Sequence, residues 1–373
     1  MSWAKDSKRL VTASADQTVR VWDVEADKCL HSWRIGDEGA VSVSDQQVGV
    51  LWPHGRSDGL IISLSLNGDL NYLTEGSSAP TKIVQGHNKS ITALGVGSDR
   101  KSVITGSFDG RVCSWDINSG TGSVVDGQAH ANQVKQFASV PGRTYSVAWD
   151  DTLRTIDESA NTFTGSSVKL NSQPQSVAAA ADGHVIVAHN NGIAVYSKDQ
   201  LVSELRTDFT PAAVAAHGSF VAVGGPDDNS VLVYTLDGGG KLSSAPTATL
   251  RSSTAKVVTL SFSPNGKHLA AGNSSGKIVV YSTGSWDVAT DRWSAHTARV
   301  LSIAWNEAGT HAASGGLDTN VFVWSLSKPG SRVKAANAHK DGVYGVAWLE
   351  GGRKVVSSGG DAAIKIWTVN GLQ

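Results

Sequence analysis

A five-position pattern recurs along the chain at a fixed spacing, and it restricts the possible folds more than any other feature of the sequence. In its most complete copy, residues 294–325, the five positions are His296, Trp305, Ser314, Asp318 and Trp324. Alternating apolar runs end at the first tryptophan, at the serine and at the second tryptophan, and turn-forming residues separate these runs. Each copy therefore predicts three short β-strands.

The same spacing recurs in two other segments. Near the C-terminus every position falls 43 residues after its counterpart, and the set is His339, Trp348, Ser357, Asp361 and Trp367. A third copy has the same intervals of 22 residues from histidine to aspartate and 6 from aspartate to tryptophan, and consists of His87, Thr105, Asp109 and Trp115. Chance does not explain this agreement.

Other segments keep only part of the pattern. The first residues of the chain align with it from Trp3 onward and contain Thr12, Asp16 and Trp22. A further segment contains His130, Ser146 and Asp150, with an isoleucine where tryptophan is expected. The remaining repeats have lost the pattern or have tyrosine near the tryptophan position, and the total is nine.

A repeat of about 40 to 45 residues that starts with Gly-His and ends with Trp-Asp resembles the WD-repeat β-propeller family. An indole N–H only donates hydrogen bonds, a hydroxyl donates and accepts, a neutral imidazole does one of each, and a carboxylate only accepts. The resemblance implies a chain of bonds from Trp through Ser or Thr and His to Asp within each repeat. We therefore interpret the histidine sets as structural braces, with no catalytic, cofactor-binding or metal-binding residue.

Nine repeats predict an all-β fold of one seven-bladed ring plus two blades of a second, incomplete propeller. The two blades are residues 1–78, and the ring is residues 79–373. We expect Thr81–Gln85 to pair with Ile364–Val369 and so close the ring, because an open sheet edge is a liability. Because the first repeat starts inside a strand, at Trp3, we expect a chain truncated at its N-terminus, with residues 1–78 the least protected region. A single nine-bladed ring is the alternative.

Several isolated motifs suggest chemistry but fit the repeat better. GNSSG, with Ser274 at its centre, matches a hydrolase nucleophile pattern, yet strand-like runs flank it on both sides where that motif needs a following helix. The histidines outside the pattern show no metal-ligand clustering, and we expect them at the surface or between blades. The tryptophans are assigned to blade packing, except Trp286 and Trp293, for which we expect more exposure.

The overall composition is that of a neutral protein. The formal net charge is −1 and the calculated pI is about 6.8, which gives no long-range attraction to nucleic acid or to an anionic membrane. No apolar stretch is long enough to span a bilayer. Cys29 and Cys113 are expected to be buried, reduced thiols. These features predict a cytoplasmic monomer that binds neither nucleic acid nor membrane.

Details outside the repeats allow a finer comparison. The runs SDGLIISLSLNGDLNYL, IVQGHNKSITAL and LSKPGSRVK make the chain similar to the actin-interacting protein 1 family, whose members are WD-repeat cofactors of ADF/cofilin. The resemblance implies a non-enzymatic protein of the cortical actin cytoskeleton that binds actin filaments and cofilin and promotes severing and disassembly. It identifies no individual contact residue. The alternative is a generic WD-repeat adaptor for peptides of a multiprotein complex, and an enzyme is a remote third possibility.

Overall fold

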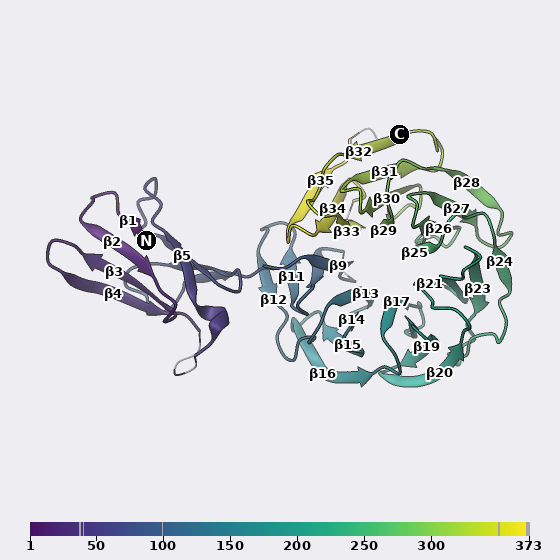
Figure 1. Ribbon diagram of the computed structural model, residues 1–373, viewed down its shortest axis with the longest axis horizontal. Coiled ribbons are helices and arrows are strands. Elements are labelled where there is room, and N and C mark those ends of the chain that lie inside the picture. Colours follow the sequence, from purple (N-terminus) through teal and green to yellow (C-terminus); the bar gives the residue numbers. More distant parts are fainter. Residues whose placement is uncertain (37–38, 40, 99, 350, 371–373) are drawn as a thin grey trace. The chain divides into compact units, whose positions relative to one another are not determined.

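The computed structural model describes residues 1–36, 39, 41–98, 100–349 and 351–370 (Figure 1). Within these residues the strands form nine antiparallel sheets, and the one helical segment is a short 3-10 turn, η1 (Val43–Asp45). No helix in the described part of the chain is long and apolar enough to cross a membrane. The predicted all-β fold of propeller-type sheets is confirmed.

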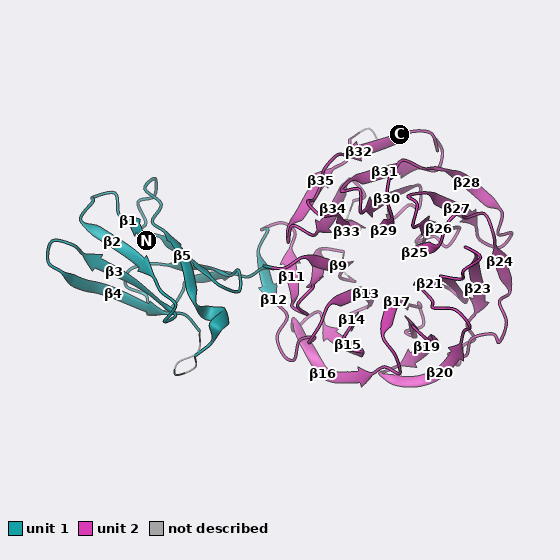
Figure 2. Cartoon of the chain, viewed as in Figure 1, with its two compact units in different colours: residues 1–88, 120–123 teal, residues 89–119, 124–373 magenta. Residues whose placement is uncertain are grey.

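The chain divides into two compact units (Figure 2). Unit 1 comprises residues 1–88 and 120–123. Its two sheets contain β1 (Ser2–Trp3), β2 (Arg9–Ala13), β3 (Thr18–Asp23) and β4 (Lys28–Arg34), and then β5 (Gln47–Leu51), β6 (Ile61–Ser65), β7 (Leu70–Leu73) and β8 (Lys82–Val84). Side chains from both sheets, such as Val21, Trp33 and Ile61, form one shared core.

Unit 2 comprises residues 89–119 and 124–373 and holds the other seven sheets, except that Gly122 and Ser123 of the outer strand β12 are counted in unit 1. The first four of these sheets contain β9 (Ile91–Val96), β10 (Ser102–Ser107), β11 (Val112–Asp116) and β12 (Gly122–Val124); β13 (Val134–Val140), β14 (Arg143–Ala148), β15 (Thr152–Asp157) and β16 (Thr162–Lys169); β17 (Pro174–Ala179), β18 (Val185–His189), β19 (Gly192–Ser197) and β20 (Gln200–Arg206); and β21 (Ala213–His217), β22 (Phe220–Gly224), β23 (Val231–Thr235) and β24 (Ala248–Leu250). The last three contain β25 (Val257–Phe262), β26 (His268–Asn273), β27 (Ile278–Ser282) and β28 (Val288–Trp293); β29 (Val300–Trp305), β30 (His311–Gly316), β31 (Val321–Ser325) and β32 (Arg332–Ala335); and β33 (Val343–Trp348), β34 (Lys354–Gly359) and β35 (Ile364–Thr368).

The seven sheets of unit 2 are arranged as blades around a common axis (Figure 1). The first strand of each sheet is innermost, and each inner strand contacts the inner strand of the next sheet, from β9 through β13, β17, β21, β25 and β29 to β33. β33 in turn contacts β9, so the ring is closed. The core consists of layers between consecutive blades, which is why the middle strands, such as β18 and β31, are buried along their whole length.

The ring is closed differently from the sequence prediction. β8, inside the segment expected to pair with the last strand, pairs with β7 instead, with Leu70 opposite Val84. The sheet of β33, β34 and β35 has three strands among the described residues. The predicted pairing of Thr81–Gln85 with Ile364–Val369 is therefore wrong. The short connection after β7 explains the outcome, because joining strands adjacent in sequence costs less chain entropy than joining the two ends of a ring.

Packing between the first and last blades replaces the missing strand pairing. Val103 from the first blade lies in one buried cluster with Ala347, Leu349 and Val356 from the last. The Ser90 hydroxyl also donates to the carbonyl oxygen of Gly360, at 3.0 Å. Closure of the ring therefore depends on contacts between the first and last blades. β8 belongs to unit 1, whose continuous segment ends at Asn88 rather than at residue 78.

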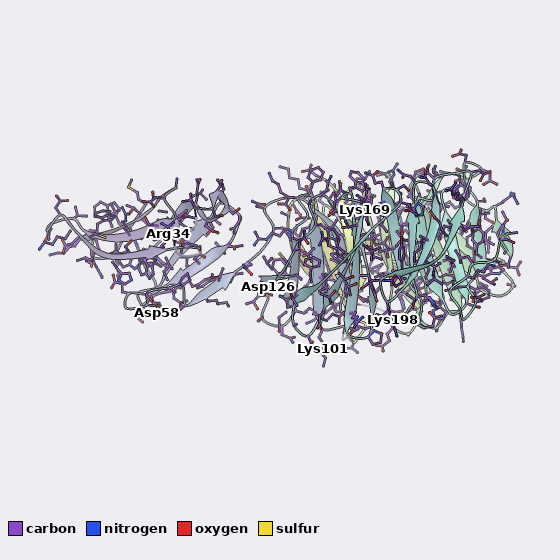
Figure 3. The ribbon with its side chains drawn as sticks, turned by 90° about the horizontal axis from the view of Figure 1, so that it is seen from below. Arg34, Asp58, Lys101, Asp126, Lys169 and Lys198 are labelled. Atoms are coloured by element: carbon purple, nitrogen blue, oxygen red, sulfur yellow. The ribbon has the colours of Figure 1, made fainter. Side chains whose placement is uncertain are left out.

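The two faces of the ring can be followed in Figure 3, where unit 2 is seen from the side. Lys169, the last residue of β16, is labelled on one face, and Lys101 and Lys198 are labelled on the opposite one. In its sheet Lys169 pairs with Thr152, the first residue of β15. Val134, at the start of the inner strand β13, pairs with Ala148 at the end of β14, next to the start of β15. The inner strands therefore begin on the face marked by Lys169.

Candidate functional site

The most complete histidine set forms one connected hydrogen-bond chain. The Trp324 indole N–H donates to Ser314 Oγ at 2.8 Å, and the same Oγ lies 2.8 Å from His296 Nε2. His296 Nδ1 lies 2.8 Å from an Asp318 carboxylate oxygen. Because a carboxylate only accepts, Nδ1 carries the proton and Nε2 accepts from the serine hydroxyl.

Local strand geometry accounts for this arrangement. In the pairing of β30 with β31, Ser314 lies opposite Phe322 and Ala312 lies opposite Trp324. The serine and the tryptophan are thus diagonal neighbours on one face of the sheet, within reach of a long side chain. Asp318 lies in the turn between the two strands, where it meets the histidine that precedes β29. The spacing of the repeat alone therefore brings the four residues together.

The last blade repeats the arrangement. Trp367 donates to Ser357 Oγ at 2.8 Å, the serine lies 2.8 Å from His339 Nε2, and His339 Nδ1 lies 2.7 Å from Asp361. The side chains of both histidines, His296 and His339, are fully buried, and both of their ring nitrogens are engaged. The serine of each set, Ser314 or Ser357, is fully buried too and accepts from the indole N–H, so the four side chains link the strands and the turn within one blade.

The partial sets are shorter versions of the same chain. His130 contacts Asp150 at 3.1 Å and Ser146 at 2.8 Å, but the tryptophan position is occupied by Ile156, which is buried and cannot donate. In unit 1, Trp22 donates to Thr12 at 2.9 Å, and Asp16 accepts from the Thr18 hydroxyl.

Three residues of the set from the third repeat lie in one blade of unit 2. Trp115 donates to Thr105 at 2.7 Å, and Asp109 accepts from the Ser107 hydroxyl. His87 lies in the residue range of unit 1, whereas the other three residues lie in unit 2. Its place in this set stays a prediction.

A different polar network occupies the repeat that lacks the pattern. In the sheet of β5 to β8, the buried Gln47 amide donates to Ser65 at 2.8 Å and its carbonyl accepts from Ser63 at 2.7 Å. Asn71 donates to Ser65 at 2.9 Å. Sequence analysis missed this brace because amide and hydroxyl residues are common in turns and surfaces. The one usable signal was their alternation with leucine and isoleucine in β6 and β7.

The buried carboxylates of the braces are held in the charged form. Burial alone would raise the pKa of Asp318, but the hydrogen bond from His296 and the backbone N–H of Thr297 outweigh this, and the pKa falls to about 2. The same balance of burial against bonds from histidine lowers the pKa of Asp361 and of Asp150. These aspartates are therefore ionised acceptors near neutral pH.

Two residues singled out from the sequence, Ser274 and Trp293, have surroundings that decide their role. Ser274 lies in the turn between β26 and β27, two antiparallel strands, so the strand-to-helix turn of a nucleophile is not present there. Trp293 is fully buried and stacks on Trp324, so the prediction that it is exposed is wrong. The bulge in the pairing of β27 with β28 turns this side chain inward, and sequence periodicity does not reveal a bulge.

Cysteines and histidines outside the braces show no reactive grouping. Neither cysteine forms a disulfide, and Cys113 is buried, but Cys29 is exposed, which corrects the expectation that both are buried. Its strand, β4, is mostly exposed, because it is the outer strand of its sheet. The His268 ring stacks on Trp305, and His189 Nδ1 shares a hydrogen bond of 2.8 Å with the Ser172 hydroxyl. Among the described residues, no group of histidine, cysteine, aspartate or glutamate side chains is placed to hold a metal ion.

The central channel of unit 2 holds polar residues that sequence analysis did not identify. A cavity of about 490 Å³ opens among the starts of the inner strands, and Lys135 and Arg299 line it together with Gln133, Gln136 and Tyr344. Such residues look like ordinary surface positions in the sequence, because only ring closure turns the first residues of seven strands toward one axis. This cavity is a hollow on the axis of the ring that could receive a ligand.

Comparisons with known proteins agree with this architecture. The profile described as "WD domain, G-beta repeat" matches residues 1–23, 78–116, 244–282, 288–325 and 330–368. Actin-interacting protein 1 of Drosophila melanogaster is 35% identical over 301 residues, which is 79% of this chain and 47% of that protein. WD repeat-containing protein 1 of Xenopus tropicalis is 33% identical over 76% of this chain and 46% of its own length.

A third relative, actin-interacting protein 1 of Caenorhabditis elegans, is 32% identical over 285 residues, or 74% of this chain and 44% of that protein. The chain thus spans about half the length of the curated relatives it matches. The Drosophila alignment is also longer than everything that follows Asn88, so the similarity is not confined to unit 2.

Proposed function

The chain is a WD-repeat protein similar to actin-interacting protein 1 along most of its length, and we propose that it is a non-enzymatic actin-binding protein of the cytoplasm. In this proposal it acts as a monomer in the cortical actin cytoskeleton. It binds filaments decorated with ADF/cofilin and promotes their severing and disassembly. The observation that carries the proposal is the similarity to proteins named for their interaction with actin, at 32 to 35% identity over about three quarters of the chain.

The geometry of the histidine sets supports a binding role over catalysis. The sets that most resemble catalytic triads have every polar atom engaged within one blade, and their histidines are buried. A substrate would have to break this brace to reach the imidazole. What the propeller offers to partners is a rigid surface made of blade edges and connecting loops, which is how a binding protein uses such a scaffold.

Co-sedimentation with actin filaments tests the proposal. The full chain is mixed with bare filaments or with cofilin-decorated filaments, and the pelleted fraction is measured. Filament loss over time is followed in parallel by light scattering. We expect the chain to pellet with decorated filaments more than with bare ones and to accelerate their disappearance.

Two controls make the result decisive. A globular protein of similar size without WD repeats reports trapping in the pellet, and the chain without filaments reports its own aggregation. If the chain remains in the supernatant with both kinds of filament and leaves the disassembly rate unchanged, the proposal is wrong. Affinity capture that recovered subunits of an unrelated complex in place of actin would favour the adaptor alternative.

A further inference from the structure

The cavity at the centre of unit 2 has an unusual charge composition. It is lined by residues from the inner strands of all seven blades, and one position from each blade recurs around it. This position is the second residue of β9, β13, β17, β25, β29 and β33, and the residue just before β21. The seven residues are Thr92, Lys135, Gln175, Ala212, Val258, Leu301 and Tyr344.

Two cations face this cavity. Lys135 belongs to the recurring position in β13, and Arg299 precedes β29 on another blade of the ring. Burial lowers the pKa of Lys135, and the positive charge of Arg299 lowers it further. The two positive charges therefore repel each other, which costs the folded protein some stability.

Neither cation is neutralised by the protein. The cavity lining contains no aspartate or glutamate. Within the described residues, neither the Lys135 ammonium nor the Arg299 guanidinium makes a hydrogen bond or an ion pair with a carboxylate. The contact recorded for Lys135 is with the Trp149 ring, whose centroid lies 5.1 Å from Nζ. Elsewhere in the chain, by contrast, surface cations such as Lys256 and Lys277 have aspartate partners.

We propose that the central channel of unit 2 binds a small phosphate-bearing anion between Lys135 and Arg299. Arginine supplies a planar fork of donors that suits phosphate oxygens, and lysine supplies a compact point charge. Gln133, Gln136 and Tyr344 add neutral donors to the lining. The bound anion replaces the mutual repulsion of the two cations with attraction to both.

The shape of the site favours a small anion over an acidic peptide. A volume of about 490 Å³ is within the range of about 300 to 1,000 Å³ found for small-molecule pockets. The walls are the inner strands of all seven blades, so the space cannot widen far without opening the ring. Two positive charges that line one hollow, Lys135 half-buried and Arg299 exposed at its edge, also concentrate small anions more than a flat surface does. This inference is independent of the proposed actin-related function.

Isothermal titration calorimetry of the full chain tests the site, with inorganic phosphate and inositol hexakisphosphate as probes. We expect inositol hexakisphosphate to bind more tightly than phosphate, and added salt to weaken both. Lys135→Gln and Arg299→Gln should each weaken binding about tenfold, and the double variant about a hundredfold, because each removes one charge-assisted contact. Unchanged circular dichroism and hydrogen exchange of the double variant would show that the fold is intact.

A matched double variant separates the channel from general surface charge. Lys267→Gln with Lys354→Gln removes the same net charge at two exposed positions outside the cavity lining. We expect it to bind both probes within about twofold of the wild type. The proposal is overturned if the wild type binds neither probe, or if the channel and control variants lose affinity equally.

Two further arms identify the source of the anion. Vesicles containing phosphatidylinositol bisphosphate test a lipid headgroup, and capture that depends on Lys135 and Arg299 would support phosphate recognition with a lipid as the source. Binding of the soluble probe without vesicle capture would support a free metabolite. A short polyglutamate peptide tests the acidic-peptide alternative, and its binding at these two residues in the absence of phosphate binding would overturn the proposal.

Discussion

Unit 1 and unit 2 are built from the same kind of four-stranded sheet, but their sheets are covered to different extents. In unit 2 every blade has a neighbour on both sides, because β33 packs against β9 and closes the ring. In unit 1 two sheets share a single core. Among the described residues, twelve large hydrophobic side chains with substantial exposure lie in unit 1 and seven in the much longer unit 2.

The second sheet of unit 1 shows the difference residue by residue. Ile61 and Leu73 face the shared core and are fully buried, whereas Leu64 and Leu70, which point to the other face, are more than a third exposed. Both faces of the sheet therefore carry large apolar side chains, as those of a blade between two neighbours would. What distinguishes the units is the burial that neighbouring blades provide, since the strands and braces within a blade are similar. The following predictions test this comparison, from the largest expected effect to the smallest.

Amide hydrogen exchange should show the largest difference. Because unit 1 buries one face of each sheet where unit 2 buries two, we expect the backbone amides of β5 to β8 to exchange at least about a hundredfold faster than those of β29 to β31. Mass spectrometry of peptides from the intact chain measures both regions in one sample, so unit 2 is the internal control. Equal protection in the two units would show that the exposed apolar face does not lower the stability of unit 1.

Removing the brace tryptophan should affect unit 2 more than unit 1. Trp324 is almost fully buried and donates to Ser314, and Trp324→Ala should destabilise unit 2 by about 3–5 kcal/mol. Trp22 makes the same bond to Thr12 but is only half-buried, and Trp22→Ala should cost unit 1 less than half as much. Urea unfolding followed by hydrogen exchange reports each unit separately. An equal loss for both would mean that the hydrogen bond, and not burial, dominates.

The Asp318 carboxylate should make unit 2 acid-sensitive. Its folded-state pKa of about 2 is below the ordinary value of 3.8, so it contributes stability that is complete above 3.8 and is lost as the pH falls toward 2. A shift of this size corresponds to roughly 2 kcal/mol. Asp318→Asn should therefore lower the urea midpoint near neutral pH, and the gap from wild type should shrink between about pH 4 and pH 2. A gap that is independent of pH would contradict this assignment.

The smallest effect is expected at an aspartate of unit 1. A hydrogen bond from Arg56 lowers the pKa of Asp58 to about 2, but both side chains are about half exposed. Solvent and salt screen such a pair, so Asp58→Asn should change the stability of unit 1 little and not measurably at about 0.5 M NaCl. The Asp318→Asn effect should persist at the same salt concentration. A salt-resistant effect at Asp58 would show that unit 1 is covered more completely than its exposed residues indicate.

Much of the blade structure follows from the sequence alone. The spacing of His296, Ser314, Asp318 and Trp324 predicts three strands and a brace, because strand alternation and short turns fix which side chains meet across neighbouring strands. The same reasoning applies to His339 and its partners and to the shortened set at His130. It also yields the number of repeats, since each repeat is one sheet whose interactions are local along the chain.

Only the tertiary structure decided what lies between the blades and at the ends of the ring. The burial of Trp293 and the placement of Lys135 and Arg299 in one cavity depend on contacts between different blades. The pairing of β8 with β7 is local, but the periodicity of the sequence did not show which of two edges β8 would join. Periodicity reports which face of a strand a side chain occupies, but it does not report which neighbour covers that face. A sheet edge or a channel position acquires its partner only when the ring closes, so its role is set by long-range packing and not by the local pattern.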